Sequence, residues 1–305
     1  MVPLYIMSII GYTSRKMRIF NSHVNQVITQ LMLYITLPAL ILFSLNIPFT
    51  TELFIDFTWL VFMSLFVLGI SIFIGALLRK KSVLPKKQKS VYESLIIFGN
   101  QGFIGLAISY IVMAEQGIIY VTLFNICYLI LIWTYGIFLF TKKEHVMNWK
   151  GLFFNPGILS TLIGLFMLFM PFSWPYLLSE TFEEIGMMTI PLSMLLIGSL
   201  LADLKWSDFQ RYLNSTYIWI AAGFKLLILP LFLLFFLFLR VPFSLIVIAV
   251  LTSAMPSAPT TTVYAQKFGA DPAFASFGVL LTTLLSILTI PILFSLLQLL
   301  HSYFY

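Results

Sequence analysis

A chain of 305 residues that is 60% hydrophobic and only 9% charged lacks the polar side chains needed to cover a water-facing surface. With a mean hydropathy of +1.02, this composition excludes an ordinary soluble domain and predicts an all-α protein that crosses a membrane repeatedly. Cys127 is the only cysteine, so an intrachain disulfide is excluded and a thiolate metal site is not expected. We expect no cofactor.

Ten apolar runs follow one another along the chain, and each is a candidate membrane span. They lie near residues 1–13, 24–46, 57–78, 91–113, 117–140, 152–171, 181–202, 213–239, 242–266 and 273–300. The first run precedes the basic cluster Arg15 to Arg18, whereas a cleavable signal peptide carries its charges first, so we expect none.

Basic residues are concentrated in alternate connections between these runs. Fifteen of the 17 lysines and arginines lie in every second connection, at Arg15, Lys16, Arg18, Arg79, Lys80, Lys81, Lys86, Lys87, Lys89, Lys142, Lys143, Lys150, Lys205, Arg211 and Lys267. The other connections hold Arg240 and the acidic residues Glu52, Asp56, Glu115, Glu180, Glu183 and Glu184. By the positive-inside rule, we expect a multi-pass protein of the cell (cytoplasmic) membrane with both chain ends outside. The net charge of +6 then fits anionic lipid headgroups, and we expect no nucleic-acid partner.

Shifting the sequence by 153 residues aligns features of its two halves. The aligned segments are Pro3 to Gly11 with Pro156 to Gly164, Thr36 to Pro38 with Thr189 to Pro191, and Gly99 to Ala107 with Thr252 to Thr260. The shared offset predicts two five-helix repeats, residues 1–151 and 152–305, within one integral membrane domain. Because five is odd, the second repeat must be inverted in the membrane, which is a common construction among secondary transporters.

The fourth run contains residues that weaken a helix near mid-membrane. They are Gly99, Asn100, Gln101, Gly102, Gly105 and Ala107. Small residues also serve simply to pack membrane helices, but three glycines with two amides favour an opened backbone beside a polar cavity. We therefore predict a helix break over residues 99–107, with the two amides contacting a substrate or ion.

The ninth run contains a second interruption. It reads Met255-Pro256-Ser257-Ala258-Pro259-Thr260-Thr261-Thr262. Each proline removes a backbone donor and clashes with the preceding turn, so we predict a break over residues 255–262. The helix that resumes near Thr260 would present free N–H groups that bind anions, and Ser257 and the three threonines would contact a substrate such as a carboxylate.

These interruptions resemble those of the auxin efflux carrier family, in particular its bacterial branch of malate and malonate permeases. The family pattern in the fourth helix is close to Asn-x-Gly-Phe-x-Gly-x-Pro, and this chain has Asn100 to Ala107 there. In the ninth helix the pattern is similar to Met-Pro-Ser-Ala followed by Lys-x-Gly-x-Asp-Pro, matched by Met255 to Ala258 and Lys267 to Pro272. Further matching positions are Asn155, Pro156, Pro191 and Gly198.

The resemblance covers essentially the whole chain. It implies ten helices with two discontinuous helices crossing at the centre, a plan shared with bile-acid/sodium symporters and sodium/proton antiporters. It also implies export or exchange of a small organic anion, a scaffold part that moves against a transport part, and a homodimer. The chain departs from the family pattern at Ala107, where the family has proline, and at Thr260, where a polar amide is common.

Four polar residues elsewhere in the runs are further candidates. Lys225, near the midplane of the eighth run, is a candidate partner for an anion or a coupling ion; its alternatives are a lysine extended along a crevice, or a neutral one beside a break carbonyl. Glu93 could relay protons or pair with the lysines of 80–89. Asn125 and Ser193 could line a cavity or form interhelical hydrogen bonds.

Taken together, these features predict a secondary active transporter, a permease or efflux carrier that moves a carboxylate or dicarboxylate by alternating access. The sequence has no Gly-x-x-x-x-Gly-Lys phosphate-binding loop, so a gradient must supply the energy, and H+ and Na+ are both candidate coupling ions. We do not expect an enzyme, because no intramembrane His, Asp or Cys residues converge. A sodium-coupled bile-acid-type symporter and a channel of the same crossed-helix plan are the alternatives.

Overall fold

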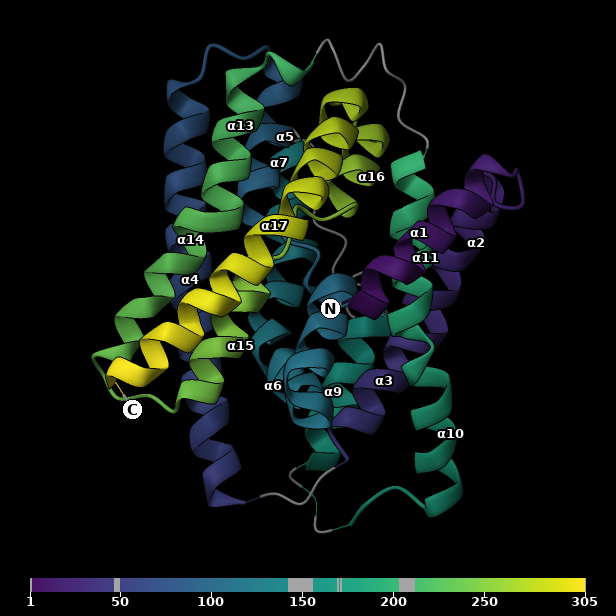
Figure 1. Ribbon diagram of the computed structural model, residues 1–305, viewed down its shortest axis with the longest axis vertical. Helices are drawn as coiled ribbons and strands as arrows, with labels where there is room; N and C mark the ends of the chain where they lie inside the picture. The colour runs from purple at the N-terminus through teal and green to yellow at the C-terminus, as the bar shows by residue number, and fades with distance from the viewer. Residues whose placement is uncertain are drawn as a thin grey trace. The chain divides into compact units, whose positions relative to one another are not determined.

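A computed structural model describes residues 2–46, 50–141, 156–168, 170, 172–202 and 212–304 (Figure 1). Every named element in these ranges is a helix, and one isolated bridge joins two non-helical segments. Among the described residues, five helices are long and apolar enough to cross a membrane: Ser22–Ser44, Thr51–Lys81, Gln101–Phe140, Thr216–Leu237 and Pro272–Phe304. The prediction of an all-α membrane protein is confirmed, whereas the count of ten spans and the inverted repeat stay predictions.

Part of the charge pattern lies outside the described ranges. The residues concerned are Lys142, Lys143, Lys150, Lys205 and Arg211, and Asn155 of the family pattern also lies outside them. The orientation expected from alternating charges therefore rests on the sequence.

The chain divides into two compact units, and each unit draws on both halves of the sequence. The first unit comprises Met1–Asp56, Gly102–Thr122 and Asn148–Leu204. The second unit comprises Phe57–Gln101, Leu123–Met147 and Lys205–Tyr305.

The first unit is a bundle of helices from the beginning and the middle of the chain. Its helices include α1 (Val2–Lys16), α2 (Ser22–Leu31), the π-helical η1 (Met32–Thr36), α3 (Leu37–Ser44), α9 (Pro156–Leu168), α10 (Tyr176–Met187) and α11 (Thr189–Ala202). α1 packs along α11, and α3 contacts both α9 and α10 (Figure 1).

Small residues bring the helices of the first unit close together. A side chain added at Gly11 of α1 would collide with the backbone of α11, and one added at Gly164 of α9 would meet Leu45 at the end of α3. Thr189 and Thr36 are buried, and the hydroxyl of Thr189 donates to that of Thr36 over 2.8 Å. The two hydroxyls thus satisfy each other where η1 and α11 cross.

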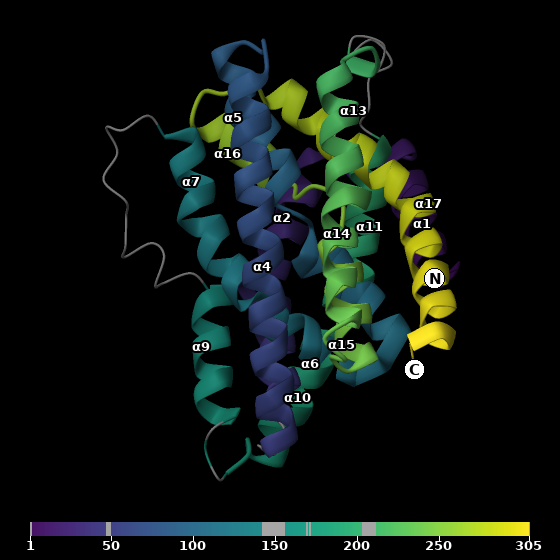
Figure 2. The same cartoon turned by 90° about the vertical axis from the view of Figure 1, so that its left-hand side faces the viewer.

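The second unit contains the two interrupted helices. Its helices are α4 (Thr51–Lys81, from residue 57), α5 (Lys86–Ile97), the later part of α6 (Leu106–Trp133), α7 (Tyr135–Phe140), α13 (Thr216–Gly223), η3 (Phe224–Ile228), α14 (Leu229–Phe232), η4 (Leu233–Leu237), α15 (Phe243–Ser253), α16 (Thr260–Lys267) and α17 (Pro272–Phe304). α5 is buried over residues 91–97 and contacts α7, α13, α16 and α17. Figure 2 shows α5, α7 and α16 side by side.

Local sequence determines where several of these helices begin. α5 and α15 start directly after Pro85 and Pro242, whose rings fix φ and which have no N–H to continue a preceding hydrogen-bond pattern. α17 starts at Pro272, where the Asp271 carboxylate accepts a 3.0 Å hydrogen bond from the N–H of Phe274. The Lys-x-Gly-x-Asp-Pro segment is therefore the turn that joins α16 to α17.

Large apolar side chains remain exposed on the helices. Phe73 of α4 is 71% exposed, and Leu288 of α17 is also largely exposed. A protein surrounded by water rarely leaves so many large apolar groups uncovered, so lipid chains are the expected neighbours of these faces.

Candidate functional site: two paired helix interruptions

The chain leaves helical geometry between α5 and α6. α5 ends at Ile97, and Phe98 adopts an extended conformation. Helical structure resumes at Gln101 with the π-helical η2 (Gln101–Gly105), which leads into α6. Glycine is among the weakest helix formers, so ending the helix near Gly99 costs little free energy.

A second interruption separates α15 from α16. α15 ends at Ser253, and α16 begins at Thr260. Pro256 and Pro259 each lack an N–H, so a continuous helix through this segment would lose two hydrogen bonds and be strained at two positions. Pro259 forms the N-cap of α16, which is a position that tolerates proline.

The two interruptions pair with each other through their backbones. Gly99 and Ser257 form an isolated antiparallel bridge. The N–H of Asn100 donates to the carbonyl of Pro256 over 2.6 Å, and the N–H of Ala258 donates to the carbonyl of Phe98 over 2.9 Å. Opened backbone inside a membrane must find partners within the protein, and here each interruption supplies the partners of the other.

Two side chains donate to carbonyls at the end of α5 and in the first interruption. The phenol of Tyr128 donates to the carbonyl of Gly99 over 2.6 Å, and the hydroxyl of Ser257 donates to the carbonyl of Leu95 over 2.7 Å. The N–H of Ser257 in turn donates to the hydroxyl of Thr282 over 3.1 Å. The interruption is therefore a fixed feature of the second unit.

Lys225 directs its amine toward the first interruption. It lies in the π-helical η3, a type of local helix widening that is frequent at functional sites, and is only 2% exposed. Its Nζ is 3.5 Å from the carbonyl of Ile97, the last residue of α5. A Cβ added at Gly99 would be 2.8 Å from Nζ, so the glycine leaves room for the amine.

The amine of Lys225 lacks a carboxylate partner. In the part of the chain that the structure describes, the resolved ion pair joins Arg79 and Glu93, and Lys225 forms none. The partial negative charge at the end of α5 is the nearest compensation that the structure provides.

Three polar side chains at the interruptions have unused hydrogen-bonding capacity. Asn100 and Gln101 are 6% and 2% exposed, and the side chain of Asn100 forms no hydrogen bond with other described residues. The buried Gln101 Oε1 and Thr260 Oγ1 atoms likewise have no partner within the described ranges. Because most buried polar groups are paired, such a cluster suggests that a polar ligand completes it.

Comparison with protein families identifies the family of the chain. The model of a family described as membrane transport proteins matches residues 1–294, almost the whole chain. The chain belongs to this family. It is the auxin efflux carrier family that the two motifs resemble, and the protein is therefore a membrane transporter. A comparison with curated proteins finds no match.

The structure brings together most of the site residues predicted for this transporter. Asn100, Gln101, Lys225, Ser257 and the segment 260–262 all belong to the second unit. Within that segment, the hydroxyl of Thr261 is 2.9 Å from that of Ser94, whereas Thr262 lies half-buried in the first turn of α16.

The remaining predicted residues are distributed differently. Gly102 and Gly105 lie in η2 and belong to the first unit, as does Ala107. Ala107 is helical, within α6, and alanine is the strongest helix former; the first interruption is therefore shorter than the 99–107 segment. Met255 is fully buried in the second interruption.

The other candidates of the transporter have local partners. Glu93 accepts a 2.6 Å hydrogen bond from Tyr135 and pairs with Arg79 at 2.9 Å, rather than with the lysines that follow. Ser193 donates to the carbonyl of Ile190 in its own helix. Asn125 is buried with its Oδ1 unpaired among the described residues.

Sequence reasoning missed Tyr128 and Thr282. Tyr128 lies three residues after Asn125, on the same helical face, which was a usable signal. Thr282 is one of several Ser and Thr residues in the long apolar α17, and no pattern distinguishes it from the others.

Proposed function

We propose that this transporter carries a small organic anion with one or two carboxylates across the cytoplasmic membrane, by alternating access around the paired interruptions. The observation that carries the proposal is the buried amine of Lys225, which lies beside the opened backbone without an ion-pair partner in the described ranges. Because the described residues supply no negative charge to balance this amine, an anion is the ligand that would complete the site.

Electrostatics gives the reason for an anionic substrate. A protonated amine buried without a counter-ion costs on the order of several kcal/mol, and a carboxylate beside it removes much of that cost. The hydroxyl of Thr260, which has no partner among the described residues, is a donor that suits a carboxylate oxygen, and the NH2 groups of the Asn100 and Gln101 amides can donate as well; the unpaired Oε1 of Gln101 is an acceptor.

The same argument supports a proton as the coupling ion. A carboxylate bound beside the amine of Lys225 favours the protonated form of that amine. Anion and proton then bind together and are carried together. Binding and protonation are linked, so each strengthens the other.

Sodium coupling is the main rival, and the position of Lys225 argues against it. In such transporters, main-chain carbonyls at a helix break commonly coordinate the sodium ion. The carbonyl of Ile97 faces the amine of Lys225, and that of Gly99 accepts from Tyr128. We therefore propose transport that does not depend on sodium.

We assign the scaffold role to the first unit and the transport role to the second. In the first unit, the hydrogen-bonded pair Thr36 and Thr189 is separated by 153 residues, the offset of the predicted repeat. Gly11 and Gly164 have the same separation, and each packs against a helix from the other half of the chain. These reciprocal contacts support two five-helix repeats related by an axis in the membrane plane.

Flux measurements in proteoliposomes test the proposal. Wild-type protein should take up a labelled mono- or dicarboxylate with saturation and counterflow, with sodium replaced by choline. Lys225→Met keeps the length of the side chain and removes its charge, and it should reduce uptake at least roughly 30-fold, because a buried charge partner is lost.

The matched control is Leu227→Met, in the same π-helical segment. It should transport at a rate close to wild type. Uptake by Lys225→Met equal to that of the control would contradict the assignment of the anion site, and large unitary currents without counterflow would instead identify a channel.

A further inference from the structure

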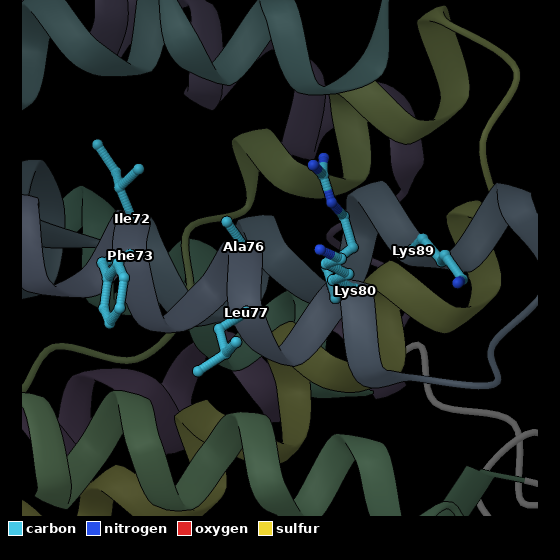
Figure 3. Close-up of a pocket in the computed structure, with 7 residues that line it drawn as sticks. Ile72, Phe73, Ala76, Leu77, Lys80 and Lys89 are labelled. Atoms are coloured by element: carbon cyan, nitrogen blue, oxygen red, sulfur yellow. The ribbon is translucent and has the colours of Figure 1, made fainter.

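The lipid-facing side of α4 carries an open groove that is separate from the helix interruptions. Its volume is about 580 Å³. It is lined by Ile72, Phe73, Ala76, Leu77, Arg79, Lys80 and Lys89 (Figure 3). All of these belong to α4 except Lys89, which α5 contributes.

Apolar and basic side chains are segregated along this groove. Ile72, Phe73, Ala76 and Leu77 lie one helical turn apart in pairs and form one end, as Figure 3 shows. The basic groups follow at the other end, where α4 finishes at Lys81. From Ile72 to Lys80 the helix rises about 12 Å. This distance is long enough for part of an acyl chain and the ester group that joins it to the headgroup.

Among the described residues, the basic end of the groove has three cationic side chains and one ion pair. Nη1 of Arg79 is 2.9 Å from Oε2 of Glu93, and this pair fixes the guanidinium in place. Glu93 compensates one positive charge, so the charges of Lys80 and Lys89 remain for a ligand. Phe73, by contrast, is largely exposed and needs an apolar neighbour.

We propose that this groove binds an anionic phospholipid, whose phosphate lies between Arg79, Lys80 and Lys89 while an acyl chain follows Phe73 and Ala76. Such a lipid matches the groove along its length. Its acyl chain fits the apolar end, and its negatively charged phosphate fits the basic end. The basic connection lies on the cytoplasmic side by the positive-inside rule, where anionic headgroups attract such residues. The proposal does not depend on the identity of the transported solute.

Native mass spectrometry of the detergent-purified full chain tests this site. Phosphatidylglycerol should be retained in preference to phosphatidylcholine with the same acyl chains. Each lysine near an anionic headgroup strengthens binding roughly five-fold, so Lys80→Gln/Lys89→Gln should weaken phosphatidylglycerol binding about 30-fold. Ala76→Phe, which fills the groove without changing the charge, should also reduce retention.

The matched control is Lys86→Gln/Lys87→Gln, which removes the same charge from the same connection but alters no residue of the groove. It should retain phosphatidylglycerol as the wild type does. Equal losses in the two double variants would mean that only net charge matters, and would overturn the proposal. Equal retention of both lipids, or displacement of phosphatidylglycerol by millimolar glycerol phosphate, would overturn it as well.

Discussion

Two helix crossings in this transporter use similar residues and reach different outcomes. In the first unit, η1 and α11 meet at Thr36 and Thr189, whose hydroxyls satisfy each other, and the chain remains helical through Pro38. In the second unit, the chain opens at Gly99 and at Pro256, and a lysine and two amides remain without full partners among the described residues.

The difference arises from the position of proline and the density of weak helix formers. Pro38 lies in the first turn of α3, where its missing N–H matters little, and the π-helical η1 accommodates the ring. Pro256 and Pro259 are three residues apart, so two consecutive turns are affected and the helix ends. A closed crossing gives a rigid scaffold, whereas an opened one provides polar groups for a ligand.

Removing an amide from the opened crossing should have the largest effect. Asn100→Leu keeps the backbone hydrogen bond to Pro256, and thus the interruption, but deletes a buried hydrogen-bonding group. A hydrogen bond to a charged ligand is typically about 1.5–3 kcal/mol, so anion uptake should fall roughly 10- to 150-fold. Uptake in proteoliposomes, at equal amounts of inserted protein, measures this, and wild-type uptake would exclude Asn100 from the site.

The dependence of anion affinity on pH should sharpen the role of Lys225. If the anion binds together with a proton on this amine, affinity should fall about tenfold per pH unit once the empty site has lost its proton. Binding of a transported carboxylate, measured by calorimetry across pH, gives the slope. In Lys225→Met the slope should vanish, and a wild-type affinity independent of pH would rule out proton coupling through this residue.

Loosening the opened backbone should have a smaller effect. Tyr128→Phe removes the hydrogen bond to the carbonyl of Gly99 and should cost about 1 kcal/mol, seen as a lower unfolding midpoint and reduced uptake. The control Tyr264→Phe removes a hydrogen bond to the carbonyl of Ile132, which is a residue of α6 and not of either interruption. This control should lower stability without a specific loss of uptake. If Tyr264→Phe lost more uptake than Tyr128→Phe, Tyr128 would not have the role assigned to it here.

The closed crossing should respond least. A double-mutant cycle of Thr36→Val and Thr189→Val should give a coupling of roughly 0.6 kcal/mol, the typical value for interhelical hydrogen bonds in membranes. Anion uptake per folded molecule should be unchanged, because the two hydroxyls at this crossing already bond each other. A loss of uptake comparable to that of Asn100→Leu would remove the distinction between the two crossings.

The sequence was informative where a feature is local. Clustered glycines, prolines and amides indicated both segments at which helices stop, and the hydropathy of the chain predicted the fold class. Alanine occupies position 107, where the family pattern has proline, and α6 begins one residue before it, at Leu106.

Contacts between distant segments could not be predicted in this way. Nothing in the sequence pairs Gly99 with Ser257, because a backbone bridge depends on how helices pack and not on side-chain identity. The depth of Lys225 in its apolar run marked it as unusual, but the carbonyl of Ile97 that it faces became evident only in three dimensions. Thr282 is one of several Ser and Thr residues in α17, and nothing in the sequence distinguished it from the others.

A structure of the transporter with a transported carboxylate bound would test the central claim most directly. The account predicts density for the carboxylate within hydrogen-bonding distance of the Lys225 amine and of at least one of the amides at positions 100 and 101, with both helices interrupted. Density elsewhere in the protein, or continuous helices through residues 98–100 and 254–259, would contradict it.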